Sequence, residues 1–410
     1  MRRWSWLPAV TCSAMLIAGC AATQPGQAQR HPDVPADAAV PALLNTGGYP
    51  TEPRQPLGWA GPNGNAIEAH RMFDALVLPF QVDPSLTVNF DTGIYKNAAA
   101  TKSGFASPVS DAVADHEFVV GIQVTGVAAK AGDDPSRPTR LLSNGWLRFS
   151  DAVHASAALA DMSTRSQTVT LPLAVGKAST TTPISVPRHP ETTAVSFTTV
   201  NDPSASYVLA FTARGPYVLT QRALSRDGAD AAAGLVAKAL DQQMPMIDGF
   251  SPTATDELGS LKLDPTGMVA RTMEPLDERN RTVEKGSYSA HGALAQFQSV
   301  AGMEQIFTDA GVDTVTFGET TTYRARDADA AGKVVEAFAA LEDPFRKYEP
   351  SDGVPGLPGS RCWFFASPSK GVQDYACFAA AGNVAFEYSG TQEDQVHQVM
   401  AAQYLMLTAK

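Results

Sequence analysis

The chain has 410 residues, of which 44% are hydrophobic and 18% are charged, and it carries a formal net charge of −11. This composition is that of a globular protein with enough residues for two domains of common size. The negative charge argues against nucleic acid as a partner, because a polyanion would be repelled.

The first residues have the form of an export signal. Two arginines precede an uncharged, mostly apolar run at residues 4–18, which is too short to span a bilayer comfortably. The run ends in LIAGC at residues 16–20, which resembles the lipobox of bacterial lipoproteins. We predict that residues 1–19 are a signal peptide and that Cys20 carries a lipid anchor at the extracytoplasmic face of the cell membrane. An ordinary secretory signal with a chance cysteine is the alternative.

Composition divides the rest of the chain. Residues 20–40 are rich in Ala, Pro, Gln and Asp and predict a flexible tether. We expect an N-terminal α+β domain at residues 41–250, with an early helix at 66–78, and a C-terminal α+β domain at residues 251–410. No later stretch reaches the roughly 18 uncharged apolar residues of a membrane-spanning helix.

An apparent internal duplication is the most informative structural pattern. The first copy has expected strands at 118–124, 206–213 and 216–224, and helices that begin near Asp151 and Asp227. The second copy has expected strands at 314–324, around Cys362, and at 375–379 and 384–388, with helices at 327–341 and 391–407. Arg148 and Asp151 correspond to Arg324 and Asp327 at a constant offset of 176 residues.

The expected fold class is α+β, with two similar halves, each a mostly antiparallel sheet with helices packed on one face. The last helix illustrates the pattern. Thr391 and Asp394 are expected to cap it, and its apolar residues recur at helical spacing as a core stripe. This stripe consists of Val396, Val399, Met400, Tyr404 and Leu407.

Two cysteines, Cys362 and Cys377, remain after the signal peptide and the lipidated cysteine are set aside. They flank a turn-like segment between two β-prone runs, so they are expected on neighbouring antiparallel strands that can meet disulfide geometry. We predict a structural disulfide. A metal site would need more ligands, and no His or Cys cluster is nearby in the sequence.

Three segments carry a resemblance to a known family. They read NTGGYPTEPR at residues 45–54, TYRARD at 322–327 and QVHQVMAAQY at 395–404. These segments resemble an uncharacterised family of actinobacterial lipoproteins, and the likeness extends over nearly all of the mature chain. It implies a lipid-anchored envelope protein with an N-terminal and a C-terminal part, and it implies no activity. The order of disulfide, strands and helix at the end is also loosely similar to sensor ectodomains of mycobacterial receptor kinases.

Candidate catalytic residues are few. Ser367 and Lys370 form an S-x-x-K pattern, but it falls in an expected hairpin turn without the partner motifs of the serine enzymes that use it. Ser289 precedes His291, but it lacks the glycine two residues earlier that a nucleophile elbow requires. We predict no catalytic residue from either pattern.

Other chemistry has no sequence support. The histidines never pair at metal-ligand spacing, and carboxylate pairs such as Asp111 with Asp115 or Glu393 with Asp394 suit solvated faces and helix caps. Gly126, Gly132 and Gly145 lack the strand-to-helix context of a nucleotide-binding loop. No metal and no cofactor are predicted.

The favoured function is non-enzymatic binding of an envelope lipid, glycan or peptide, for which a cleft between the two halves is the expected place. Two alternatives stay open. One is an envelope hydrolase whose site is assembled from residues distant in sequence, and the other is an accessory protein in an envelope complex. The membrane, through Cys20, is the expected partner in every case.

Overall fold

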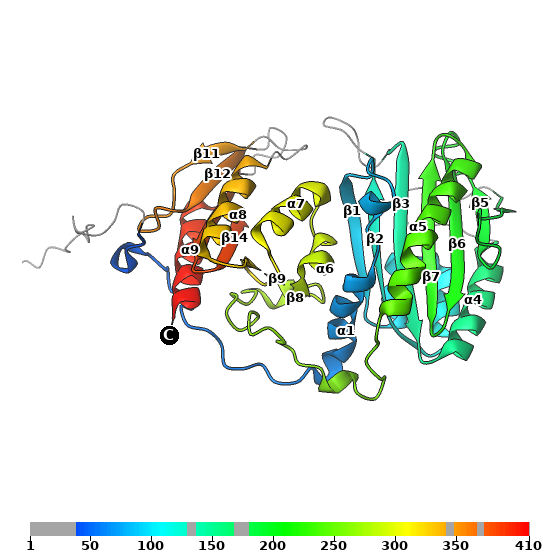
Figure 1. Ribbon diagram of the computed structural model, residues 1–410, viewed down its shortest axis with the longest axis horizontal. Coiled ribbons are helices and arrows are strands. Elements are labelled where there is room, and N and C mark those ends of the chain that lie inside the picture. Colours follow the sequence, from blue (N-terminus) through cyan, green and yellow to red (C-terminus); the bar gives the residue numbers. More distant parts are fainter. Residues whose placement is uncertain (1–37, 129–136, 168–179, 342–347, 367–372, 410) are drawn as a thin grey trace, which may run out of the picture.

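Residues 38–128, 137–167, 180–341, 348–366 and 373–409 are described in a computed structural model of the chain. The predicted signal peptide, Cys20 and most of the predicted tether lie outside the described residues. The described residues form two seven-stranded sheets that lie next to one another along the long axis of the molecule (Figure 1). Among their helices, none combines the length and apolar character needed to cross a membrane.

The two sheets share one strand order. The first sheet runs β1 (Val88–Tyr95), β2 (Phe118–Val127), β3 (Arg140–Phe149), β7 (Tyr217–Ser225), β6 (Ser206–Arg214), β5 (Thr193–Phe197) and β4 (Thr182–Pro183). The second runs β8 (Gly286–Ser289), β9 (Thr314–Phe317), β10 (Thr321–Arg324), β14 (Val384–Gly390), β13 (Gln373–Ala381), β12 (Arg361–Ala366) and β11 (Glu349–Ser351). In each sheet the last strand pairs with the third, and the remaining strands continue to the far edge.

The helices that follow these strands also correspond. α4 (Ala152–Ser166) follows β3, and α8 (Ala328–Ala340) follows β10, while α5 (Ala229–Gly249) and α9 (Glu393–Thr408) close the two halves. Asp151 caps α4 by accepting hydrogen bonds from the backbone N–H groups of Val153 and His154 at 2.8 and 2.9 Å, and Asp327 caps α8 through Ala330 at 2.8 Å. The α+β class and the two similar halves are confirmed.

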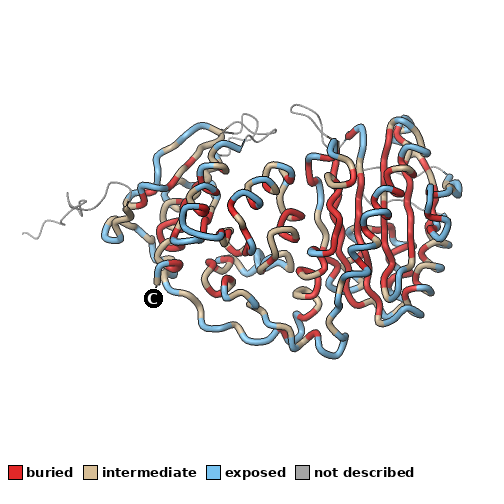
Figure 2. The backbone as a smooth tube through the Cα atoms, viewed as in Figure 1, coloured by how far each residue is buried: buried red, intermediate tan, exposed pale blue. Residues whose placement is uncertain are grey.

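The helices cover both faces of each sheet, where the sequence predicted one face. α5 and α9 lie on one face, and α4 and α8 lie on the other. The first sheet shows why, because nearly all successive residues of β2, β3 and β7 are buried (Figure 2). In β7, Tyr217 and Leu219 belong to the core beneath α5, whereas Val218 and Leu224 belong to the core beneath α4. Each half therefore has three layers.

A buried glutamine from each closing helix satisfies backbone groups of a segment that belongs to neither sheet. Gln243 of α5 accepts a hydrogen bond from the N–H of Val77 at 2.9 Å and donates to the carbonyl of Ala75 at 2.6 Å. Gln403 of α9 accepts from the N–H of Met273 at 2.8 Å and donates to the carbonyl of Arg271 at 2.8 Å. We call these two arrangements the glutamine clamps.

Each clamp also reaches the third strand of its sheet, directly or at the turn that precedes it. Asn144 of β3 donates to the Gln243 side-chain oxygen at 2.9 Å, and Thr320, just before β10, donates to the Gln403 oxygen at 2.6 Å. Asn144 and Thr320 are separated by the same 176 residues as Asp151 and Asp327. The duplication therefore extends to matching buried polar contacts.

The first described residues lie on the C-terminal half. The N–H of Val40 donates to the carbonyl of Gly356 at 2.8 Å, and the N–H of Arg54 donates to the carbonyl of Ala270 at 2.9 Å. Tyr49 packs against a small cluster that includes Val399 of α9. The chain then crosses to the N-terminal half, where α1 (Gly64–Met72) begins, so this segment lies in space with the half that follows it much later in sequence (Figure 1).

The predicted disulfide is present between Cys362 of β12 and Cys377 of β13, which face each other in the antiparallel register. The two cysteines are 15 residues apart. Closing a loop of that size stabilises the fold by about 3 kcal/mol in the chain-entropy model.

Two local expectations differ from the structure. The expected strand at 314–324 is two strands, β9 and β10, because Gly318 to Thr320 form a tight turn. Gln392, rather than Thr391, precedes the first turn of α9, and no side chain caps it. The predicted core stripe of α9 is confirmed at Val396, Val399, Met400 and Leu407, which are all buried.

We predict that Gln243→Ala lowers the free energy of unfolding by about 3 kcal/mol, because it leaves the buried N–H of Val77 and the carbonyl of Ala75 without partners. Urea unfolding of the intact chain measures the change. Gln242→Ala is the matched control, because Gln242 is exposed and makes a single 3.5 Å hydrogen bond. Equal effects of the two substitutions would contradict the clamp.

Candidate functional site

Ser289 and His291 do not form a nucleophile and base. Ser289 Oγ donates to the carboxylate of Asp74 and accepts from the N–H of Gly292 at 3.1 Å, so it caps the short helix α6 (Ala290–Leu294). His291 Nε2 lies 2.9 Å from the carbonyl oxygen of Leu76 and not beside Ser289 Oγ. The S-x-x-K pattern at Ser367 and Lys370 lies outside the described residues.

The carboxylate pairs have structural roles. Asp111 lies 3.8 Å from the Lys102 ammonium, and Asp115 lies 2.6 Å from Arg165. Glu393 and Asp394 occupy the first turn of α9, where negative charge complements the helix N-terminus.

Within the described part of the chain, one group has metal-ligand spacing. It consists of Cys362, Cys377 and His397, with ligand atoms within 4.8 Å of one another. The two sulfurs are bonded to each other, so they are not free to bind a metal.

The junction of the two halves is a continuous apolar core rather than the expected binding cleft. Phe73, directly after α1, and Leu294 of α6 belong to the same buried cluster, and the rings of Phe73 and Tyr288 lie 6.0 Å apart. His70 packs against Tyr288 at 4.3 Å, with its Nε2 2.8 Å from the carbonyl oxygen of Val283. Burial lowers the pKa of His70 to about 4.

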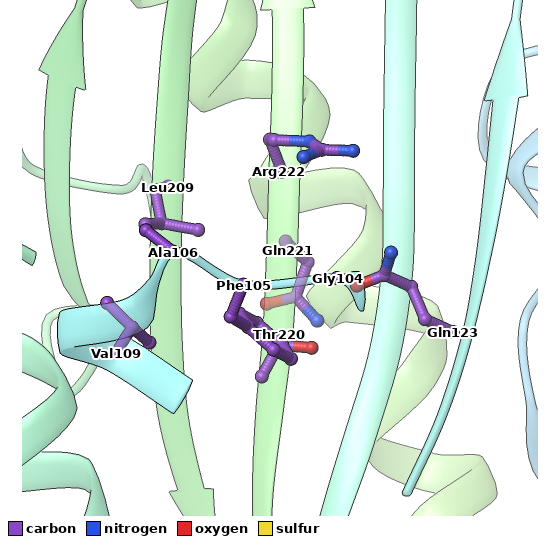
Figure 3. Close-up of a pocket in the computed structure, with 9 residues that line it drawn as sticks. All are labelled: Gly104, Phe105, Ala106, Val109, Gln123, Leu209, Thr220, Gln221 and Arg222. Carbon is purple, nitrogen blue, oxygen red and sulfur yellow. The ribbon is translucent and has the colours of Figure 1, made fainter. Parts of the chain in front are cut away.

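A cavity lies inside the N-terminal half, on the α4 face of the first sheet (Figure 3). It is a narrow, partly open cleft with a cavity volume of about 20 Å³, which is room for about one water molecule. One wall is the segment before α3 (Ser107–Ala114) together with its first turn, and the other is formed by β2, β6 and β7. The lining residues are Gly104, Phe105, Ala106, Val109, Gln123, Leu209, Thr220, Gln221 and Arg222.

The strand register explains why space remains there. Gly93 of β1, Gln123 of β2, Gly145 of β3 and Thr220 of β7 stand opposite one another in one row across the sheet. Gly145 therefore leaves no side chain between Gln123 and Thr220. A Cβ atom at Gly145 would lie 2.4 Å from the carbonyl oxygen of Ile122, so the backbone requires glycine at this position.

The equivalent row of the second sheet is filled. Phe317 of β9 and Thr321 of β10 take the places of Gln123 and Gly145, and Glu387 of β14 takes the place of Thr220. Tyr323 donates a 2.5 Å hydrogen bond to Glu387, whose pKa burial raises to about 7. The two halves thus share a topology, and Phe317 stands in one half where Gln123 borders the cavity in the other.

Two polar side chains that line the cavity have a buried atom without an internal partner. Arg222 has a buried Nε without a hydrogen-bond acceptor, although part of its side chain stays accessible, and Thr220 Oγ1 is buried without a partner. Burial lowers the pKa of the Arg222 guanidinium, and this effect is opposed by the phenols of Tyr95 and Tyr207 and by the Asp91 carboxylate. The site can therefore accept a ligand that supplies acceptors.

The sequence contained a signal for this cavity that periodicity did not reveal. Gly93, Gly121 and Gly145 lie inside strands, where glycine weakens packing and marks a close approach of another group. Arg222, Thr220 and Gln123 were not predicted as site residues. Their side chains come together only through the pairing of β1, β2, β3 and β7.

The chain belongs to the DUF7373 family, a family of unknown function. Residues 59–263 match its N-terminal domain, and residues 268–410 match its C-terminal domain. This confirms the expected membership of an uncharacterised family with an N-terminal and a C-terminal part. No curated protein matches the chain.

One solved structure with a likeness is the extracellular domain of PknH from Mycobacterium tuberculosis. The identity is 12% and the TM-score 0.33, over 46% of this chain and 98% of that one. A likeness with this identity and TM-score assigns neither a shared fold nor a shared function.

We predict that Thr220→Val raises the free energy of unfolding of the ligand-free protein by about 1 kcal/mol, because it removes a buried hydroxyl without a partner. Thr212→Val is the control. Thr212 is also buried, but its hydroxyl is 2.8 Å from that of Thr192, so its loss should lower stability by about 1 kcal/mol. Denaturant unfolding measures both, and a loss at both positions would refute an unpartnered Thr220.

We predict that acid weakens the junction through His70. Between pH 6.5 and 4 the unfolded chain binds a proton on this histidine and the folded chain does not, so stability falls as the pH falls, by roughly 3 kcal/mol in total. His70→Gln keeps a donor for the Val283 carbonyl and cannot titrate, so its unfolding free energy should depend less on pH in this window. Identical pH slopes for both proteins would contradict the assignment.

Proposed function

We propose that this protein is a non-enzymatic, extracytoplasmic binding protein, tethered by a lipid on Cys20, that holds an envelope lipid, glycan or peptide. The observation that carries the proposal is the cavity on the α4 face of the first sheet. It combines an apolar wall, formed by Phe105, Val109 and Leu209, with buried polar groups that no other residue satisfies. Binding sites commonly have this composition, a mostly apolar lining with a few polar groups that orient the ligand. With a volume of about 20 Å³, this cleft would take one group of such a ligand rather than the whole of it.

The proposed location is supported by chemistry at both ends of the chain. The LIAGC sequence at residues 16–20 has the residues of a lipidation site. The disulfide between Cys362 and Cys377 persists in oxidising compartments outside the cytoplasm. A lipid on one cysteine would hold the protein at the membrane surface.

The described chain starts at residue 38 on the C-terminal half, while the cavity lies in the N-terminal half (Figure 1). A tether from Cys20 therefore joins the half that lacks the cavity. In this arrangement the C-terminal half would lie nearer the membrane than the N-terminal half, which holds the cavity.

Binding is favoured over hydrolysis because Ser289 and His291, the described residues that the sequence raised for catalysis, make separate structural contacts. A hydrolase would need a nucleophile within reach of a base. Hydrolysis of an envelope ester or glycan, and service as an accessory protein, are outcomes that the following experiment separates from binding.

We predict that one class of envelope extract raises the melting temperature of the lipid-free chain, residues 21–410. Lipid, glycan and peptide fractions are tested separately, and a ligand at 100 times its dissociation constant adds about 2.7 kcal/mol to the free energy of unfolding. Ala106→Leu fills the cavity and should abolish the rise. Phe90→Ala is the control for non-specific adsorption, because Phe90 is 53% exposed outside the cavity, and it should keep the rise.

Several results would overturn the proposal. These are no rise with any fraction, a rise that Ala106→Leu keeps, or a rise that Phe90→Ala abolishes. Turnover of chromogenic ester or glycan substrates would favour the hydrolase instead. A second chain that co-purifies in stoichiometric amount, with no small ligand bound, would favour the accessory protein.

A further inference from the structure

A second cavity lies in the C-terminal half and is large enough for a small ligand. It has a volume of about 410 Å³, within the range of roughly 300–1,000 Å³ that small-molecule sites have, and it is open to solvent. We call it the polar pocket, and it is lined by Asn280, Thr282, Lys285, Gly318, Glu319, Tyr388 and Ser389. We infer that the polar pocket binds an uncharged sugar. This goes beyond the proposed function, because it uses none of the residues that line the cavity of the N-terminal half.

The polar pocket exists because neighbouring strands end at different points. β14 pairs with β10 only as far as Glu387, which stands opposite Thr321, whereas it pairs with β13 to its last residue, Gly390. The space beside the end of β14 is bordered by the turn between β9 and β10, where Gly318 carries no side chain. A Cβ atom at Gly318 would lie 2.2 Å from the carbonyl oxygen of Met273, so the backbone requires glycine there. The backbone of this turn therefore keeps the space open.

Four lining side chains have hydrogen-bonding groups that the described part of the chain leaves available. None of them makes a side-chain hydrogen bond or an ion pair with a described residue, and they are Asn280, Thr282, Lys285 and Ser389. Burial lowers the pKa of Lys285, and the carboxylates of Glu319 and Glu284 oppose this effect. The ammonium of Lys285 is thus attracted by carboxylates but keeps its donors for a ligand.

The remaining polar groups of the pocket are held in place by hydrogen bonds. The Tyr388 hydroxyl donates to Glu319 Oε1 at 3.1 Å, and the N–H of Leu276 donates to Glu319 Oε2 at 3.2 Å. Each oxygen of a carboxylate can accept more than one hydrogen bond, and a phenol oxygen that donates can also accept. The polar pocket therefore presents oriented acceptors beside the available donors.

The composition of the lining indicates the class of ligand. Among the described residues, no apolar aliphatic side chain lines the polar pocket, so an acyl chain would gain little contact there. Lys285 and Glu319 carry opposite charges, which favours an uncharged ligand over an anion or a cation. Each sugar hydroxyl can both donate and accept, which matches a lining that offers ammonium and amide donors together with carboxylate acceptors.

A peptide suits the polar pocket less well than a sugar. Peptides that bind through their backbone add a strand to a free sheet edge, and other bound peptides place apolar side chains in apolar grooves. Only the short end of β14 beyond Glu387 lacks a partner on the β10 side, and the lining is polar. An uncharged sugar is therefore the ligand that the contacts favour.

The test measures binding of neutral trisaccharides of glucose, mannose, galactose and N-acetylglucosamine to the lipid-free chain, residues 21–410, by saturation-transfer NMR and calorimetric titration. At least one should bind. Lys285→Met should weaken that binding about tenfold, because one charge-assisted hydrogen bond is lost. Ser389→Leu places an apolar side chain in the pocket and should abolish binding. Lys262→Met is the matched control, because Lys262 is also exposed but lies outside the polar pocket, and it should keep the affinity.

The melting temperature of the ligand-free chain separates a binding role from a structural one. Lys285→Met and Ser389→Leu should both leave it unchanged, because neither side chain has a hydrogen-bond partner among the described residues. Lost sugar binding with an unchanged melting temperature supports the inference. A melting temperature that falls in both variants would show that these side chains support the fold, and would overturn the inference.

Other outcomes would also overturn it. These are no binding by any of the four sugars, sugar binding that Lys285→Met and Ser389→Leu both keep, or tighter binding of trialanine than of every sugar. Sugar binding that Ala106→Leu abolishes and Ser389→Leu keeps would place the sugar in the N-terminal cavity, which would support the proposed function and overturn the inference. A thermal rise from a lipid or peptide fraction without sugar binding would overturn the inference alone, and absence of both would overturn both.

Discussion

The need to satisfy buried backbone groups constrains this fold more than any other interaction. In each half a segment outside the sheet packs against the closing helix, with Leu76 at the centre of one and Thr272 at the centre of the other, both almost fully buried. These segments are not paired as strands, so their N–H and carbonyl groups would be unsatisfied away from water. Gln243 and Gln403 supply both a donor and an acceptor from the closing helix. These hydrogen bonds hold the closing helix against the segment in each half.

The two halves show how one topology can hold a site in one copy and a packed core in the other. Strand order, helix caps and glutamine clamps agree, so the difference arises from a few side chains in equivalent rows. Where the second sheet has Phe317 and Thr321, the first has Gln123 and Gly145, and the space left by the glycine is bordered by Arg222. A packed interior does not keep such space when larger apolar side chains are present. Membership of the DUF7373 family covers both halves, and the proposed binding role belongs to the first.

Much of the fold was predictable from local patterns. Helix caps at Asp151 and Asp327, the buried stripe of α9 and the pairing of Cys362 with Cys377 each depend on residues close together in sequence or on one hairpin. Helix placement was less predictable. β7 has apolar side chains on both faces of the sheet. A short apolar run in the sequence does not show whether helices pack on one face of the sheet or on both. The attachment of residues 40–54 to the C-terminal half also escaped local patterns, because its partners, such as Gly356 and Ala270, are more than two hundred residues away.

The sequence by itself determined the class of the fold, its repetition and the disulfide, because these follow from periodicity and spacing along the chain. It also supplied the expectation of a lipid on Cys20. The tertiary structure alone decided the position of the candidate site. Phe105 precedes α3, while Gln123, Thr220 and Arg222 come from two different strands, and they meet only after β3 has been placed between β2 and β7. The lack of a carboxylate partner for Arg222 is likewise a property of that assembly, since it depends on which residues stand across the sheet.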